Sequence, residues 1–336
     1  MVPNDPRVNV VLGTWFAMTT LAASAMVIHG KLRRKREAEA LAAVNKSGDE
    51  GKAAETEEGK SEKKAKKGGG FWAKIGSYLF INVLFILIAW SPFKVFAVSV
   101  LLLGYICMYE VGKVSRWCRE GRGFFASPHF YAVSTVIMLG TFAYNNHEIS
   151  FKVLVLLGVL HTLVTSFAGD LQMLLNRSTL GALAVLYLPL CLSCHLYLKL
   201  VVPDGFLVLF YYLVVCATDS FGQIVGTIVG GKKLTPVLSP GKTVSGAIGG
   251  TIAAVIVALA IRVCLPTTPT IWVALAAVWI SISAQIGDLV ASSWKRFLGI
   301  KDFGANLGPH GGVIDRFDSM LLAASAFFLF TSIMPY

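Results

Sequence analysis

The chain has 336 residues, of which 55% are hydrophobic and only 15% are charged, and its formal net charge is +11. A soluble domain usually carries about one charged residue in four, so this composition excludes a soluble globular protein and predicts an all-α polytopic membrane protein. The positive charge does not indicate nucleic-acid binding, because the basic residues lie in short segments between apolar runs. In such segments Lys and Arg set membrane orientation and attract anionic lipid head groups.

The first apolar run, Val8–Ile28, predicts one extra N-terminal transmembrane helix within residues 1–30. A cleaved signal peptide has a basic segment before its apolar run. Here the basic cluster follows the run, which favours a retained anchor with its N-terminus outside. Residues 31–70 contain no aromatic residue and are rich in Lys, Glu, Ala and Gly. Such a segment cannot bury enough apolar surface to offset its ordering entropy, so we expect a charged, disordered cytoplasmic linker there.

Residues 71–336 predict a catalytic membrane domain of about nine helices, since a span needs about 20 apolar residues and tolerates somewhat fewer. Its apolar runs are Tyr78–Trp90, Phe93–Tyr109, Phe130–Tyr144, Phe151–Phe167, Leu180–Leu198, Phe206–Thr218, Ala247–Leu265, Ile271–Val290 and Met320–Met334. The two runs separated by Ser91-Pro92 are either two helices or one long helix kinked at the proline.

The distribution of basic residues predicts how these runs cross the membrane. When they are threaded alternately from an outside N-terminus, the inside segments contain 25 of the chain's 30 Lys and Arg residues. The positive-inside rule therefore supports this threading and favours two separate helices around Pro92. The inside segments are 29–77, 110–129, 168–179, 219–246 and 291–319. We expect a multi-pass protein with its polar site on the cytosolic side of the endoplasmic reticulum, an organelle inner membrane or a bacterial inner membrane.

Ionised residues are costly near membrane spans unless they are paired or hydrated, and here they gather at one predicted depth. Asp219 ends the seventh run, and Asp288 lies near the inner end of the ninth. The segment that follows contains Lys295, Arg296, Lys301, Asp302, His310, Asp315, Arg316 and Asp318. In a helix, Asp288 shares a face with Lys295, and Asp315 shares a face with Asp318.

This mixture of residues indicates a phosphate-and-metal site rather than a loop that only sets topology. Neighbouring aspartates repel one another unless a cation lies between them, and carboxylate oxygens suit hard cations. Lys and Arg suit phosphate oxygens. Gly311-Gly312 would let backbone N–H groups approach an anion closely.

The inside segment 219–246 is a second candidate element, predicted as a glycine-rich loop. Its Ser239, Lys242 and Thr243 side chains, together with backbone N–H groups, could bind a nucleotide. Alternatively, its later glycines allow two helices to pack closely. Both interpretations remain open from the sequence.

The stretch SSWKRFLGIKDFGANLGPHGGVIDRFDS, residues 292–319, resembles the signature of the phosphatidate cytidylyltransferase (CDP-diacylglycerol synthase) family. The matching positions are Ser292, Lys295-Arg296, Lys301-Asp302, His310-Gly311-Gly312, Asp315-Arg316 and Asp318. The upstream strings DSFGQIVG and SPGKTVSGAIGG also resemble the segment that precedes this signature in the family. The resemblance covers about residues 71–336.

The resemblance implies transfer of the cytidylyl group of CTP to phosphatidate, with Mg²⁺ and a second cation such as K⁺. It implies that the metal ligands are Asp288, Asp315 and Asp318, with Asp219 as a fourth. It implies catalytic phosphate contacts from Lys295, Arg296, Lys301 and Arg316, and a role for His310 either in phosphate contact or in loop architecture. The implied nucleotide contacts are Ser239, Lys242 and Thr243.

The expected partners are CTP, phosphatidate and membrane lipids, with a homodimer considered and no nucleic acid. One alternative function is a CTP-dependent polyprenol or phytol kinase, which would transfer the γ-phosphate to a lipid alcohol. Another is an ion-coupled transporter, which would move its substrate without CTP turnover. The predicted charges lie at the membrane face, whereas transporter sites lie near the midplane, and this disfavours a transporter.

Overall fold

The computed structural model describes residues 5–20, 76, 79–115, 127–144, 152, 156, 171–304, 306–307 and 311–334. The predicted linker 31–70, most of the predicted span Phe151–Phe167, and His310 lie outside these described residues. Predictions that concern them stay predictions.

The described residues are almost entirely helical, which confirms the predicted all-α class. The helices are 6–20, Leu79–Trp90, α3 (Phe93–Val114), α5 (Pro128–Ala143), α7 (Leu171–Val201), α8 (Phe206–Ile228), α9 (Val244–Ala260), α10 (Thr270–Phe297) and α11 (Ile314–Thr331). Short elements are the hairpin β1 (Lys233–Thr235) and β2 (Ser239–Thr243), and the 3-10 turn η2 (Arg262–Cys264). In the described part of the chain, α3, α8 and α10 are long and apolar enough to cross a membrane.

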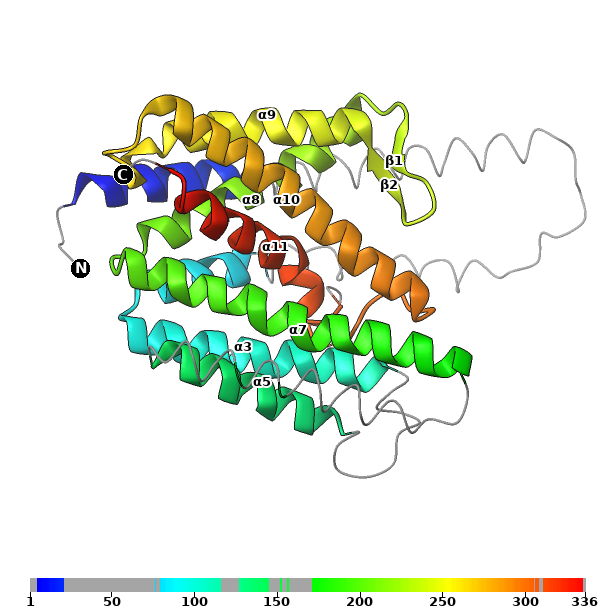
Figure 1. Cartoon of the computed structure of the whole chain (residues 1–336). Coiled ribbons are helices and arrows are strands. Elements are labelled where there is room, and N and C mark those ends of the chain that lie inside the picture. The colour runs from blue at the N-terminus through cyan, green and yellow to red at the C-terminus, as the bar shows by residue number, and fades with distance from the viewer. Residues whose placement is uncertain are drawn as a thin grey trace, which may run out of the picture.

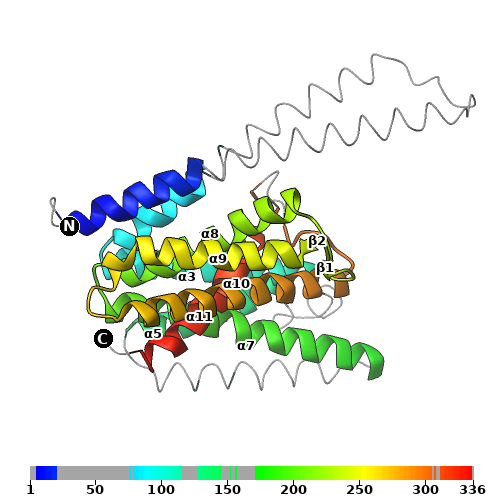
Figure 2. The same ribbon diagram turned by 90° about the horizontal axis from the view of Figure 1, so that it is seen from above.

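Two groups of helices form the bundle (Figure 1). In one group, α3, α5 and α7 lie side by side, and Gly104 of α3 allows close contact with Leu139 and Leu192. In the other, α9 and α10 pack on α8 and on each other, and α11 packs on α10. Contacts of α7 and α3 with α11 join the two groups. Figure 2 shows the same arrangement from above, with the helix 6–20 on the outside.

Helix α8 lies in the core because it is apolar on every side over its first three turns. All residues from Phe206 to Val215 are buried, which is the pattern of a helix surrounded by other helices. The predicted seventh run ends at Thr218, but α8 continues to Ile228. The prediction that Asp219 ends this span is therefore wrong, and Asp219 lies within the helix.

The extension of α8 packs backbone to backbone against α9. A Cβ at Gly246 would lie 2.5 Å from the carbonyl oxygen of Gly222, and one at Gly250 would lie 2.5 Å from that of Thr218. Small residues spaced four apart allow such close approach of two helices. The close-packing interpretation of these glycines is confirmed. The remainder of segment 219–246 is a hairpin rather than an irregular loop.

The chain reverses direction at Ser91-Pro92, so the two runs around the proline are separate antiparallel helices. Lys199 of α7 donates a hydrogen bond to the carbonyl of Ala89 and lies over the ring of Phe96, so it contacts both sides of the turn. From there one helix extends to Asn82, whose Oδ1 accepts a hydrogen bond from Tyr212 in the second turn of α8. The other runs to Glu110, which contacts the start of α11.

The N-terminal helix 6–20 docks at the same end of the bundle as Lys199. Arg7 lies 4.2 Å from the ring centre of Phe206 and forms ion pairs with Asp5 and Asp204. Val11 and Met18 of this helix are buried.

Candidate active site

A cavity of about 790 Å³ opens where α8, the hairpin, α9, α10 and α11 converge. Its polar wall contains charged residues from all of these elements except α9, which contributes glycine and alanine. The charged residues are Asp219, Lys242, Asp288, Lys295, Asp302, Asp315, Arg316 and Asp318. Residues predicted from two separate segments of the sequence thus share one cavity.

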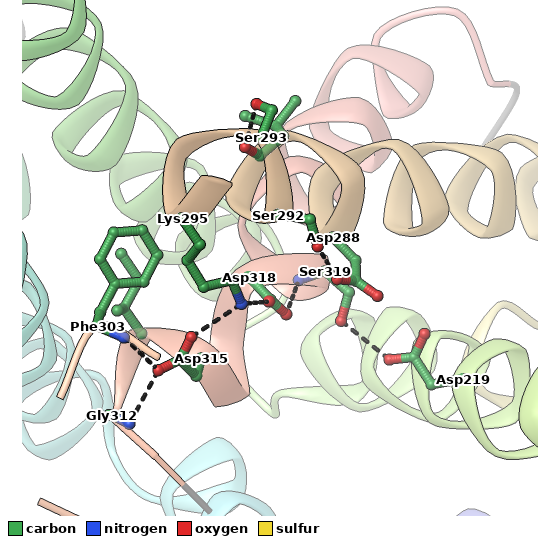
Figure 3. Close-up of polar contacts among 12 residues, drawn as sticks. Asp219, Asp288, Ser292, Ser293, Lys295, Phe303, Gly312, Asp315, Asp318 and Ser319 are labelled. Atoms are coloured by element: carbon green, nitrogen blue, oxygen red, sulfur yellow. Dashed lines mark hydrogen bonds and ion pairs between the residues drawn. The ribbon is translucent and has the colours of Figure 1, made fainter. Parts of the chain in front are cut away.

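Asp315, in the first turn of α11, uses both carboxylate oxygens within the protein (Figure 3). Oδ2 accepts hydrogen bonds from the backbone N–H groups of Phe303 and Gly312, at 2.8 and 2.9 Å. Oδ1 accepts one from Lys295 Nζ at 2.9 Å, and the side chain is only 2% exposed. This carboxylate therefore fixes the segment before α11 as well as facing the cavity.

Lys295, near the end of α10, lies between two carboxylates of α11. Its Nζ is 2.9 Å from Asp315 and 3.8 Å from Asp318 Oδ2. The last helix begins at Ile314, six residues before the predicted apolar run Met320–Met334, so Asp315 and Asp318 share a face of α11 and point toward the same ammonium group. Because Lys295 is 14% exposed, its pairing is little screened by solvent.

The other two aspartates lie farther along the same wall. Asp219 Oδ2 accepts a hydrogen bond from Ser319 Oγ at 3.0 Å, which ties α8 to α11. Asp288 Oδ2 lies 2.5 Å from Lys242 Nζ, which ties α10 to the hairpin. Lys242 and Lys295 therefore offset part of the negative charge that Asp219, Asp288 and Asp318 place around the cavity.

The donor chemistry of this wall fits a hard cation. Asp219, Asp288 and Asp318 present carboxylate oxygens to the same cavity, and oxygen ligands suit Mg²⁺. Within the described residues, no three His, Cys, Asp or Glu side chains are already close enough to hold a metal ion. Asp315 differs from the other three because its Oδ2 accepts hydrogen bonds from two backbone N–H groups while its Oδ1 accepts one from Lys295. The predicted metal ligands stay a prediction.

The predicted nucleotide contacts Ser239, Lys242 and Thr243 all line the cavity. Thr243 also has a structural role, because its Oγ1 accepts the backbone N–H of Gly246 at 3.1 Å and caps the N-terminus of α9. The hairpin thus places Ser239 and Lys242 in the cavity lining. Its last residue, Thr243, is held in place because it caps α9.

The predicted catalytic residues separate into three groups. Lys295 and Arg316 line the cavity. Arg296 and Lys301 are exposed and are not part of its lining, and Arg296 instead donates to the carbonyl of Leu238 at 3.4 Å. His310 lies outside the described residues.

Sequence reasoning missed two polar residues that organise this region, Ser319 and Glu110. Ser319 follows Asp318 directly, but nothing in the sequence indicates its bond to Asp219. Glu110 is only 2% exposed at the end of α3 and receives hydrogen bonds from the segment before α11. Its sequence signal was a lone carboxylate between Tyr109 and Val111 at the end of an apolar run.

Comparison with known proteins identifies the family. A sequence model described as the cytidylyltransferase family matches residues 72–334. Proteins named phosphatidate cytidylyltransferase from Staphylococcus saprophyticus, Staphylococcus epidermidis and Staphylococcus aureus are 44%, 41% and 42% identical over 115 residues. Each alignment covers 34% of this chain and 44% of the relative, so the chain matches less than half of each relative's length. The family match spans well over half of the chain, and the chain therefore belongs to the cytidylyltransferase family.

Proposed function

We propose that this protein transfers the cytidylyl group of CTP to phosphatidate and releases pyrophosphate. The observation that carries the proposal is a cavity lined by both charged and apolar side chains, in a membrane protein of the cytidylyltransferase family. Its charged residues include aspartates and the basic residues Lys242, Lys295 and Arg316. Its apolar residues include Ile81, Phe85, Val215 and Met320. A nucleotide and a lipid phosphate need both kinds of side chain in one cavity.

The proposed reaction requires charge neutralisation more than proton transfer. A phosphate oxygen of phosphatidate attacks the α-phosphorus of CTP, a new P–O bond forms, and the bond to the β-phosphate oxygen breaks. The attacking oxygen is already anionic, so no strong general base is needed. The barrier arises because two anions must meet, and fixed positive charges lower it.

The basic residues of the cavity have the chemistry for this task. Lys295 lies beside the carboxylates of α11, where it would bind a phosphate oxygen while keeping Asp315 and Asp318 in place. Lys242 and Ser239 lie on the hairpin, and we assign them to the nucleotide phosphates. Arg316 is exposed and lines the cavity, and its planar group suits two oxygens of one phosphate.

We assign Asp219, Asp288 and Asp318 as the residues that would hold Mg²⁺, with K⁺ proposed as a second cation. When bound, Mg²⁺ would supply positive charge to the phosphates. The Lys242–Asp288 pair places a lysine where a cation would compete for Asp288. Release from this pair would leave Lys242 free to contact a phosphate.

We further propose that the cavity faces the cytosol, where CTP is available. The support is the positive-inside bias of the basic residues. The outer face of the helix Leu79–Trp90 is apolar and exposed at Phe80, Leu84 and Leu87, as a lipid-facing surface would be. Phosphatidate would reach Ile81 and Phe85 from this side, with its head group at the polar wall.

The test uses the purified full chain in lipid, with Mg²⁺, phosphatidate and CTP labelled separately in the α- and γ-phosphates. We expect the α label in the lipid and the γ label in pyrophosphate. Lipid that carries only the γ label would contradict the proposal and indicate a lipid kinase. Substrate flux without consumption of CTP would also contradict it and indicate a transporter. Lys113→Gln removes a positive charge at an exposed position of α3, and we expect this control variant to show unchanged label transfer.

A further inference from the structure

The buried carboxylate of Glu110 receives three hydrogen bonds from a segment about two hundred residues away in sequence. Oε1 accepts from Asn306 Nδ2 at 2.6 Å and from the backbone N–H of Val313 at 3.0 Å. Oε2 accepts from the backbone N–H of Ile314 at 3.1 Å. Glu110 lies near the end of α3, whereas the segment precedes α11, so these bonds join the two helix groups.

Two of these bonds cap the N-terminus of α11, which has no capping side chain of its own. The first backbone N–H groups of a helix have no partner within it, and the residue at the N-cap of α11 is Val313, which has no side-chain oxygen. The carboxylate of Glu110 provides that oxygen from α3. Its negative charge is also favourable at the positive end of the helix dipole.

Glycine residues allow the segment to approach this carboxylate. A Cβ on Gly304 would lie 2.8 Å from Glu110 Oε1, and a Cβ on Gly312 would lie 2.6 Å from Oε2. Any other residue at either position would push the backbone and the carboxylate apart. The close approach therefore depends both on the Glu110 carboxylate and on the two glycines of the segment.

Glu110 and Asp315 hold the same segment from two sides. The N–H groups of Phe303 and Gly312 go to Asp315 (Figure 3), and the next two N–H groups after Gly312 go to Glu110. The cavity residues Asp302 and Arg316 flank this segment. Their positions therefore depend on a carboxylate that is not part of the cavity lining.

We infer that Glu110 is a positioning residue for the active site, acting through the segment before α11 and not through contact with substrate. The kinetic part of this inference rests on the proposed cytidylyl transfer. The structural part does not, because the three hydrogen bonds can be measured without turnover.

The experiment compares Glu110→Gln with the unchanged full chain in lipid. The variant keeps the shape of the side chain but turns one acceptor into a donor, which faces a backbone N–H. Hydrogen exchange at Val313 and Ile314 should rise about tenfold or more, because loss of a charged acceptor leaves a buried N–H without a partner. We expect kcat to fall about tenfold or more while the KM for CTP changes by less than about threefold.

Two control variants on α3 separate positioning from general stability. Lys113→Gln should leave exchange and turnover unchanged. Gly104→Val adds atoms where a single Cβ would already lie 2.7 Å from Leu139 Cδ1, so it should lower the thermal midpoint. It should not accelerate exchange selectively at Val313 and Ile314, nor lower kcat of the folded protein.

If Glu110→Gln does not fold, Asn306→Ala provides the test, because Asn306 is exposed and only one of the three bonds is removed. It should raise exchange at Val313 and lower kcat by about two- to fivefold. If Glu110→Gln folds, normal exchange and normal kcat in that variant would overturn the inference. If it does not fold, the same result in Asn306→Ala would overturn it. Faster exchange in a protein that proves to have no cytidylyl transfer would instead overturn the proposed function.

Discussion

Two lysines at opposite ends of the bundle, Lys295 with little exposed surface and Lys199 with none, have contrasting surroundings. Lys295 is paired with two carboxylates, Asp315 and Asp318, in the lining of the cavity. Lys199 has no exposed surface, donates to the carbonyl of Ala89, and lies 5.9 Å from the ring centre of Phe96. We propose that Lys295 exchanges a carboxylate for a phosphate, whereas Lys199 joins three helices and is not among the residues that line the cavity. Low exposure of a lysine therefore does not indicate a catalytic role. The residues that pair with it and a neighbouring cavity are better indicators.

The largest effect should come from Asp318, a carboxylate of the cavity lining. Asp318→Asn removes a negative charge that Lys295 faces and that we assign to the cation site. Turnover should fall about a thousandfold, the size typical of losing a main electrostatic group. Label transfer from α-labelled CTP measures it, with chromatography of the purified protein as the check on folding. Near-normal turnover would remove Asp318 from the reacting centre and weaken the contrast between the two lysines.

Lys295→Met tests the cavity lysine directly, with its neighbour Arg296→Met as the matched comparison. Loss of Lys295 should lower kcat/KM about a hundredfold and destabilise the fold by about 3 kcal/mol, because two largely buried carboxylates lose their partner. Arg296 is exposed and donates to a carbonyl of the hairpin, so its loss should cost less than about fivefold. Steady-state kinetics and thermal unfolding measure both. Equal kinetic losses would contradict the separation of the two residues.

Lys242→Met tests the lysine on the hairpin. Its side chain is 27% exposed and paired with Asp288. We expect the KM for CTP to rise about tenfold with a smaller change in kcat, because one phosphate contact is lost. The measurement is a CTP titration at fixed phosphatidate. A change confined to the phosphatidate KM would assign Lys242 to the lipid phosphate and contradict our nucleotide assignment.

The smallest kinetic effect should come from Lys199→Met. The substitution keeps most of the volume and removes one hydrogen bond, so we expect loss of about 1 kcal/mol of stability. Turnover of the folded protein should be unchanged. A thermal melt and a single saturating rate measurement suffice. A large fall in kcat would show that the far end of the bundle communicates with the cavity and would end the contrast.

Much of this arrangement was predictable because it depends on local patterns. Apolar runs predicted the helices of the described region, and the spacing of Asp315 and Asp318 predicted their common face on α11. The end of α8 was not predictable in the same way. The apolar window stops at Thr218, but the helix continues because Gly222 and Gly226 pack against another backbone, which is a tertiary effect.

The sequence predicted which residues form the candidate site better than it predicted how they contact one another. Asp219 and Asp288 were grouped with the later aspartates from threading alone, and they do share a cavity. Which oxygen meets which donor could not be predicted, so Asp315 was treated as equivalent to Asp318 although backbone N–H groups occupy it. Glu110 was missed because its partners are 196 to 204 residues away along the chain.

The glycine contact between α8 and α9 has a consequence for how the enzyme would respond to its membrane. With carbonyl oxygens of Gly222 and Thr218 set against Gly246 and Gly250, the two helices cannot slide past each other without a collision of backbones. A thicker or thinner bilayer would therefore tilt the pair as one rigid body. The distance between Asp219 and the hairpin would then stay the same. The rate of catalysis should therefore not depend on acyl-chain length in the host bilayer, although the tilt of the helices should.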